Sequence, residues 1–77
     1  MATEFGKFLR KLRIDADETQ GDMAKRLDVA QSFLSAVENG KKGIPKALCR
    51  KILDSYSLSL EQKYQLTMLF MEDVKTI

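Results

Sequence analysis

The stretch of residues 19–40 constrains the fold of this chain more than any other part of the sequence. Its apolar residues are spaced by three or four: Met23, Ala24 and Leu27 in the first half, and Leu34 and Val37 in the second. Such spacing places each set on one face of a helix. Because only residues 28–30 separate the two halves, the helices cannot lie flat in one layer. We therefore predict two short helices that cross steeply and share a small core.

The second of these predicted helices spans residues 31–38 and turns short, neutral side chains away from the shared core. A helix about 10–12 Å across fits the major groove of B-DNA. There Gln pairs with adenine, Ser bonds to several base edges, and Ala meets the thymine methyl. The chemistry therefore predicts a helix-turn-helix that contacts bases. Its candidate base-contacting residues are Gln31, Ser32, Ser35 and Ala36, and Asn39 also faces outward.

Positively charged residues come directly after this helix in the sequence. Asn39-Gly40 predicts its C-terminal end, because Gly readily adopts a positive φ. The lysines that come next are Lys41, Lys42 and Lys46. Residues 1–53 hold 11 Lys and Arg against 7 Asp and Glu, whereas residues 54–77 hold 2 against 4. We therefore expect these lysines to lie near DNA phosphates, with a solvated basic surface as the alternative.

Length and composition exclude several classes of protein. The chain has 77 residues, which predicts one domain over residues 1–77. It contains no histidine and one cysteine, Cys49, so a disulfide, a thiolate metal cluster and the commonest general base are missing. We expect neither an enzyme nor a bound metal or cofactor. No apolar run approaches the ~18 residues of a membrane span and no signal peptide is visible, which predicts a cytoplasmic protein.

The rest of the sequence predicts three more helices and no strand, so the expected fold class is all-α with five helices. The first spans residues 3–15, with an apolar stripe of Phe5, Phe8, Leu9 and Leu12. The fourth starts with Pro45 at its first position and runs to about residue 55. Its predicted inward residues are Leu48, Cys49, Ile52 and Leu53. The fifth spans residues 60–74 behind a capping box of Ser59 and Gln62.

Apolar residues cover more than one face of the helix predicted over residues 60–74. They are Leu60, Tyr64, Leu66, Met68, Leu69, Phe70, Met71 and Val74. Monomers rarely expose an apolar patch of that extent. Two interpretations therefore remain open: the helix is wholly buried, or one face binds a partner and contributes to dimerisation.

The motif of residues 19–41 resembles that of the Cro/C1-type (XRE) DNA-binding proteins, which include phage repressors, small bacterial regulators and antitoxins. The matching residues are Thr19-Gln20, Ala24, Leu27, Val29, Gln31-Ser32-Phe33-Leu34-Ser35 and Glu38-Asn39-Gly40-Lys41. The resemblance extends from residue 5 to about residue 53. It implies a five-helix lambda-repressor-like domain with a central helix-turn-helix.

The resemblance also implies roles for individual positions. Gln31, Ser32 and Ala36 fall where family members contact bases. Gln20, Phe33, Ser35, Asn39 and Lys41 fall near the DNA backbone, and Gln20 also near the recognition helix. Arg13 and Glu38 fall where the family has a structural ion pair, against the alternative of two exposed, independent charges.

Three residues depart from the family pattern. Asp28 stands where the turn commonly has Gly, and Asp tolerates the left-handed region better than most residues. Ala30 replaces a Ser or Thr that would cap the recognition helix. Ala36 replaces a longer polar residue, which leaves fewer hydrogen bonds to bases and gives DNA shape a larger share of specificity.

The predicted function is a sequence-specific, DNA-binding transcriptional regulator of a bacterium or phage. We expect a repressor that binds double-stranded DNA as a homodimer on an inverted repeat, without a membrane partner. The alternative is an antitoxin or adaptor of the same fold whose main partner is another protein, such as a toxin or co-regulator. A domain that packages DNA without sequence preference is a further alternative.

Overall fold

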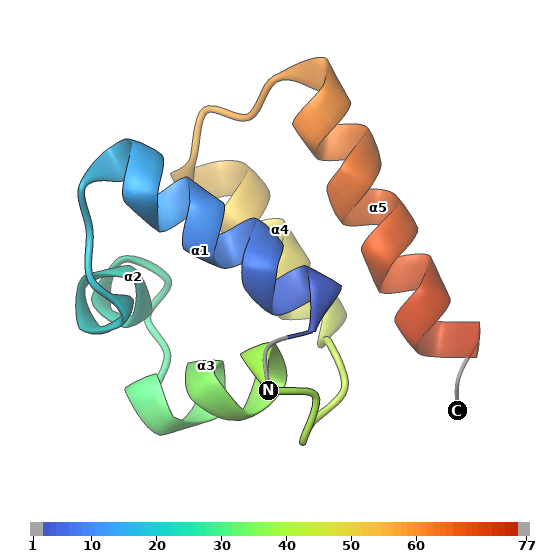
Figure 1. The fold of residues 1–77 in the computed structure, drawn as a ribbon, viewed down its shortest axis with the longest axis horizontal. Helices are drawn as coiled ribbons and strands as arrows, with labels where there is room; N and C mark the ends of the chain where they lie inside the picture. The colour runs from blue at the N-terminus through green and yellow to red at the C-terminus, as the bar shows by residue number, and fades with distance from the viewer. Residues whose placement is uncertain (1–2, 76–77) are drawn as a thin grey trace. The chain divides into compact units, whose positions relative to one another are not determined.

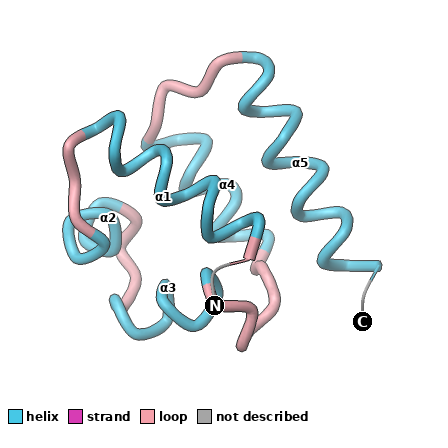
Figure 2. Tube along the Cα trace, viewed as in Figure 1, coloured by secondary structure: helices cyan, strands magenta, loops and turns pink. Residues whose placement is uncertain are grey.

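The computed structural model describes residues 3–75, with side chains described as far as residue 73. Its helices are α1 (Glu4–Ala16), α2 (Gln20–Arg26), α3 (Gln31–Glu38), α4 (Lys46–Ser55) and α5 (Leu60–Lys75). Loops join them, and the described chain contains no strand (Figure 2). The predicted all-α fold class with five helices is therefore confirmed. None of the helices within residues 3–75 combines the length and the apolar character that crossing a membrane requires.

The chain forms two compact units, residues 1–42 and residues 43–77. In the first unit, α1, α2 and α3 all pack against one another, and in the second α4 packs against α5. Figure 1 looks along the axis of α2 while α3 lies across the view, so these two helices cross steeply, as expected. The expectation of a single domain over residues 1–77 stays a prediction.

The core of the first unit consists of the residues that helical spacing selects. Its buried apolar side chains are Phe5, Phe8, Leu9 and Leu12 from α1, Met23, Ala24 and Leu27 from α2 and its end, and Leu34 and Val37 from α3. Full burial of one such large side chain contributes about 1.5–3 kcal/mol. The amphipathic stripes thus hold the two helices of residues 19–40 against α1.

Capping interactions define both ends of α1. At its start, Gly6 N–H donates to the Thr3 hydroxyl at 3.1 Å. At its end, Asp17 adopts the left-handed region with φ 56°. Asp17 N–H then donates to the Ile14 carbonyl at 3.2 Å, and Glu18 N–H donates to the Arg13 carbonyl at 2.8 Å. This pattern is a Schellman motif, which extends α1 one residue beyond the predicted end.

In the second unit, α4 and α5 begin close to the predicted positions. Pro45 is the N-cap of α4 rather than its first helical residue, so the helix starts one residue late. Ser59 and Gln62 form the predicted capping box: Ser59 N–H donates to Gln62 Oε1 at 2.9 Å, and Gln62 N–H donates to Ser59 Oγ at 3.1 Å. Asp73 of α5 accepts the Ile44 N–H at 2.8 Å and ties the loop before α4 to α5.

One predicted core residue of α4 is wrong. Leu48 and Ile52 are buried and Cys49 is half-buried, whereas Leu53 is 43% exposed. Five residues correspond to 1.4 turns of an α-helix, so Leu53 points well away from the face that Leu48 shares with Ile52. The buried face of α4 is therefore narrower than the sequence predicted.

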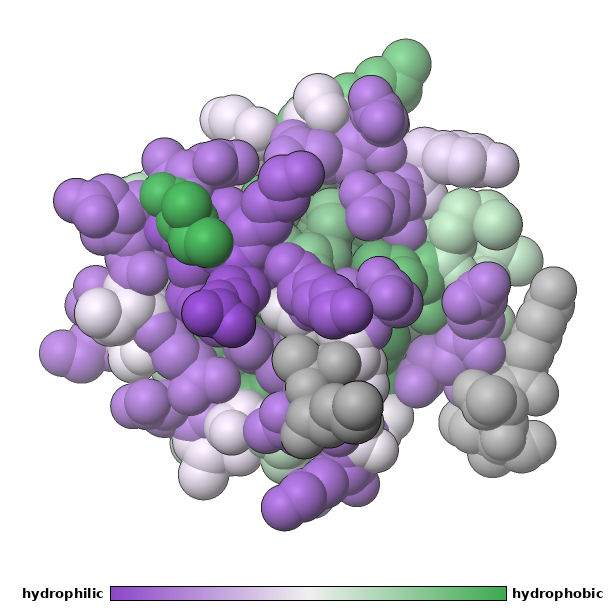
Figure 3. Space-filling view, in the orientation of Figure 1, coloured by the Kyte–Doolittle hydropathy of each residue, from purple (hydrophilic) through white to green (hydrophobic). Residues whose placement is uncertain are grey.

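α5 has one buried and one exposed row of apolar side chains, so it is not wholly buried. Leu66 is buried, while a second row on α5 is exposed: Leu60 at 84%, Tyr64 at 68%, Met68 at 43% and Met71 at 51%. Figure 3 shows hydrophobic side chains reaching the surface along α5. Of the two interpretations left open for this helix, the exposed apolar face is the one that the structure contains.

Candidate nucleic-acid interface

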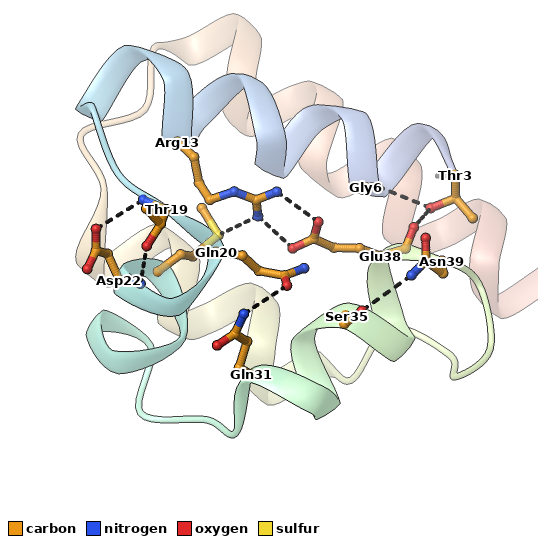
Figure 4. Close-up of polar contacts among 11 residues, drawn as sticks. Thr3, Gly6, Arg13, Thr19, Gln20, Asp22, Gln31, Ser35, Glu38 and Asn39 are labelled. Atoms are coloured by element: carbon orange, nitrogen blue, oxygen red, sulfur yellow. Dashed lines mark hydrogen bonds and ion pairs between the residues drawn. The ribbon is translucent and has the colours of Figure 1, made fainter. Parts of the chain in front are cut away.

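Reciprocal hydrogen bonds between Thr19 and Asp22 fix the start of α2 (Figure 4). Thr19 N–H donates to Asp22 Oδ2 at 3.0 Å, and Asp22 N–H donates to Thr19 Oγ1 at 3.1 Å. The bond from the Thr19 backbone N–H, with a smaller contribution from the Thr19 side chain, holds the pKa of the Asp22 carboxyl group below its ordinary value. This pair of bonds is a capping box, and it sets the residue at which the helix-turn-helix begins.

The turn between α2 and α3 relies on Asp28, whose φ is 56°. Val29 N–H reaches back to the Ala24 carbonyl at 2.9 Å and closes the turn. Left-handed backbone costs roughly 1–2 kcal/mol for most L-residues and less for Asp. Asp28 therefore adopts the left-handed backbone conformation that Gly commonly supplies in this turn, and this conformation allows α3 to leave α2 steeply.

The start of α3 has no side-chain cap. Ala30 is the N-cap, and no side chain accepts a hydrogen bond from the first turn of the helix. The absence of a cap at Ala30 was expected. The N–H groups of this first turn, which have no partner within the helix, are consequently able to donate to an anion.

A buried ion pair anchors the other end of α3 to α1 (Figure 4). Arg13 Nη1 lies 2.6 Å from Glu38 Oε2, and Arg13 Nη2 lies 3.1 Å from Glu38 Oε1. Only 11% of the Arg13 side chain and 8% of the Glu38 side chain are exposed. Arg13 Nη1 also contacts Met23 Sδ of α2 at 3.4 Å. The guanidinium therefore connects all three helices of this unit, and the alternative of two independent exposed charges is wrong.

The backbone of Glu38 is anchored as well, through residues that sequence analysis missed. Its carbonyl oxygen accepts hydrogen bonds from the Thr3 N–H at 3.0 Å and from the Thr3 hydroxyl at 2.9 Å. A Cβ at Gly6 would overlap this same carbonyl oxygen. Gly6 is thus required for the close approach of α1 to the end of α3. The only signal in the sequence was an isolated glycine inside a helical apolar stripe.

Gln31 and Ser32 are the most accessible of the predicted base-contacting residues, since both are exposed on the first turn of α3. Gln31 Nε2 donates to Gln20 Oε1 at 3.4 Å, so α2 supports the side chain from behind (Figure 4). A Cβ at Gly21 would lie 3.3 Å from Gln31 Oε1. Gly21 therefore leaves room for the Gln31 amide.

Ser35 and Ala36 lie farther along the same helix and are half-buried. Asn39 is exposed, and its Nδ2 donates to Ser35 Oγ at 3.3 Å. This hydrogen bond orients the Ser35 hydroxyl, which keeps its own proton to donate. The accessible part of α3 is therefore its N-terminal half, with Ser35 and Ala36 at its margin.

The candidate backbone-contacting residues differ in their placement. Gln20 and Phe33 are half-buried within the helix-turn-helix, whereas Asn39, Lys41 and Lys42 are exposed at and beyond the end of α3. The N–H groups of Lys41 and Lys42 both donate to the Ala36 carbonyl, at 2.9 and 3.3 Å. Lys46, in contrast, is the exposed first residue of α4 in the second unit. The first unit thus brings together all of these residues except Lys46.

Comparison with known proteins identifies the family. The family model of the helix-turn-helix domain matches residues 4–64, which is most of the chain. No curated protein and no solved structure matches the chain in the corresponding comparisons. The match covers α1 to α4 and the beginning of α5, including the anchored pair of helices described above. The chain belongs to the helix-turn-helix domain family.

Proposed function

We propose that this protein is a sequence-specific DNA-binding transcriptional regulator and that α3 is its recognition helix. The observation that carries the proposal is the anchoring of α3 at one end and its exposure at the other. Glu38 is held by Arg13 and Thr3, while Gln31 and Ser32 extend from the first turn. A helix fixed in this way presents polar side chains to a major groove without losing much conformational entropy on binding.

In this proposal, base contacts come from Gln31 and Ser32, with Ser35 and Ala36 beside them. The DNA backbone is contacted by Gln20, Phe33, Asn39, Lys41, Lys42 and Lys46. Lysines contribute the electrostatic, sequence-independent part of the affinity, and the polar face of α3 contributes the discrimination between bases. The hydrogen bond between Gln20 and Gln31 supports this division, because it gives the base-contacting amide a fixed neighbour on the backbone-contacting side.

We further propose a homodimer that represses transcription by occupying an inverted-repeat operator in the cytoplasm of a bacterium or phage host. Two recognition helices in successive major grooves require half-sites about 34 Å apart. The exposed row of Leu60, Tyr64, Met68 and Met71 on α5 supports an apolar interface with a second copy. Occupation of an operator is sufficient for repression, so binding alone accounts for the proposed regulation.

Selection from a random pool of double-stranded DNA tests the proposal. The expected result is an enriched inverted repeat whose half-sites are one helical turn apart. A gel-shift assay with the enriched duplex should show much weaker binding by the Gln31→Ala/Ser32→Ala variant. The matched control is Gln65→Ala/Ser57→Ala, which removes the same two residue types from exposed positions in the second unit. Failure of the pool to converge on any sequence would contradict the proposal.

A second candidate function is favoured by the same exposed row on α5. An antitoxin or adaptor of this fold would use that row to bind a different protein rather than a second copy. Sedimentation of the purified chain separates the two functions. A dimer that dissociates on Tyr64→Ser/Met68→Ser substitution supports the homodimeric regulator, whereas a monomer that co-purifies stoichiometrically with another protein supports the antitoxin or adaptor.

A further inference from the structure

A cavity of about 590 Å³ lies between α4 and α5, within the second unit. Its volume falls in the range of about 300–1,000 Å³ that is typical of small-molecule sites. The family assignment gives this cavity no role, and none of the residues of α3 lines it. It is therefore independent of the proposed base-contacting surface.

The walls of the cavity are largely apolar. α5 contributes Leu66, which is buried, and Phe70, which is half-buried. α4 contributes Leu53, which is 43% exposed although the sequence predicted it to face inward. Burial of a ligand against Leu53 and Phe70, which both keep exposed surface, would remove apolar surface from water at about 25 cal/mol per Å². The cavity thus suits a ligand with an apolar body.

Two cations, Lys46 and Arg50, also line the cavity. They lie four residues apart, which puts them on adjacent turns of the same face of α4. Both side chains are exposed, and neither forms an ion pair with a carboxylate among residues 3–73. The nearby Asp73 carboxylate accepts a hydrogen bond from Ile44 N–H and does not line the cavity. The lining therefore combines two cations with an apolar wall.

We propose that this cavity binds an amphiphilic anion: a small molecule with an aromatic or alkyl body and a carboxylate, sulfonate or phosphate head group. The body packs on Leu53 and Phe70, and the head group pairs with Lys46 and Arg50. Arg50 is suited to hold two oxygens of the head group at once, because its guanidinium donates in parallel pairs. Charge complementarity distinguishes this ligand from a neutral apolar molecule of the same size.

Binding at this cavity would have a consequence for DNA. Lys46 belongs to the proposed phosphate-contacting residues, so an anionic ligand on Lys46 competes with a DNA phosphate for the same cation. This consequence rests on the proposed function, whereas the ligand site itself does not. The tests below therefore use no DNA, and their failure is distinguishable from failure of the proposed function.

A pair of fluorescent dyes that differ in charge tests the site directly. Anilinonaphthalene sulfonate is anionic and aromatic, and N-phenylnaphthylamine is its neutral counterpart. The full chain should bind the anionic dye more tightly than the neutral one, with an affinity that falls as salt concentration rises. Lys46→Gln/Arg50→Gln should weaken the anionic dye roughly tenfold and leave the neutral dye unchanged. The control Arg10→Gln/Lys11→Gln removes two exposed cations of α1 and should change neither affinity.

Cys49 offers an independent readout of occupancy in the unmodified protein. It lines the cavity and is the only cysteine of the chain. Burial, with a smaller contribution from the Asp73 carboxylate, raises the pKa of the Cys49 thiol to about 11. Alkylation of this thiol by iodoacetamide is therefore slow, and it is followed at mildly alkaline pH. Saturating anionic dye should slow the alkylation of Cys49 by at least about fivefold, because the dye covers a thiol that has only partial solvent access.

Three results would overturn the proposal. The first is that the anionic dye does not bind the wild-type chain, or binds no better than the neutral dye. The second is that the anionic dye loses affinity on Met68→Ser/Met71→Ser substitution, which changes the exposed row of α5 and leaves the cavity lining intact. The third is that Cys49 alkylates at an unchanged rate when the dye is bound. The circular dichroism of each variant verifies that it has folded.

Discussion

Replacing Arg13 by Met would leave the Glu38 carboxylate buried without its partner. Both side chains are about nine-tenths buried and share two hydrogen bonds. Met keeps much of the apolar volume of the arginine stem, so loss of charge and of hydrogen bonds dominates the effect. The substitution also removes the contact of the guanidinium with Met23, which weakens the attachment of α2.

The magnitude follows from the burial of the pair. Removing one partner of a buried ion pair costs about 3–5 kcal/mol, most of it the penalty for the charge that remains. A chain of this size has a total stability of about 4–12 kcal/mol. Arg13→Met is therefore expected to lower the free energy of unfolding by about 3–5 kcal/mol and Tm by roughly 4–8 °C for each kcal/mol lost. Replacing both partners, in Arg13→Met/Glu38→Met, is expected to cost less than Arg13→Met alone.

Urea unfolding followed by circular dichroism measures these changes, and the four proteins of the double-mutant cycle yield the coupling free energy. Lys7→Met is the control, because both side chains of the Lys7–Glu4 ion pair are largely exposed, at 67% and 77%. Its cost should stay below about 1 kcal/mol. Equal costs for Arg13→Met and Lys7→Met, or additive effects of Arg13→Met and Glu38→Met, would refute the assignment of Arg13–Glu38 as the anchor of α3.

Four further predictions follow from single features. Gly6→Ala should lower the free energy of unfolding by about 2 kcal/mol or more, because its Cβ overlaps a backbone carbonyl of α3; chemical denaturation that finds no loss contradicts that close approach. Asp17→Gly should raise thermal stability by about 1 kcal/mol, because Gly adopts the left-handed C-cap of α1 without strain; an unchanged Tm contradicts this. Asp22 has a folded-state pKa below its ordinary 3.8, so its stabilisation is present above that pH and disappears as the pH falls through the lower folded-state pKa. When the free energy of unfolding is measured as the pH falls below 3.8, Asp22→Asn should therefore lose less stability than the wild type. An equal loss in the two proteins would argue against the capping box. Lys41→Ala and Lys42→Ala should each weaken DNA binding equally for all sequences and reduce the slope of log K against log salt by about 0.9; a sequence-dependent loss is the result that would place the lysine at a base.

The helix-turn-helix was the most predictable part of the fold, because local chemistry alone specifies it. The bounds of α3 coincide with the predicted residues 31–38. The helix begins after Ala30, and Asn39-Gly40 ends it. Gly40 has a φ of 78°, which only glycine adopts readily. The spacing of residues could not predict the Arg13–Glu38 ion pair, because its members are 25 residues apart. That prediction was based on the family resemblance.

The residues that sequence analysis missed depend on contacts between distant segments. Gly6 and Thr3 contact Glu38 more than 30 positions away, and nothing local distinguishes Gly6 from a tolerated helical glycine. Leu53 was assigned to the core because apolar spacing identifies a face without showing whether anything covers it. The exposed row of α5 had the same ambiguity, which only the packed structure resolves.

The most direct test of the account is the specificity ratio of the recognition helix. Fluorescence anisotropy would measure the affinity of the chain for the selected duplex and for a scrambled duplex of the same composition, at one salt concentration. If Gln31 and Ser32 contact bases, the Gln31→Ala/Ser32→Ala variant should lose about 1–3 kcal/mol of discrimination per contact while keeping its affinity for the scrambled duplex. An unchanged ratio, or an equal loss on both duplexes, would contradict the claim that α3 reads the DNA sequence.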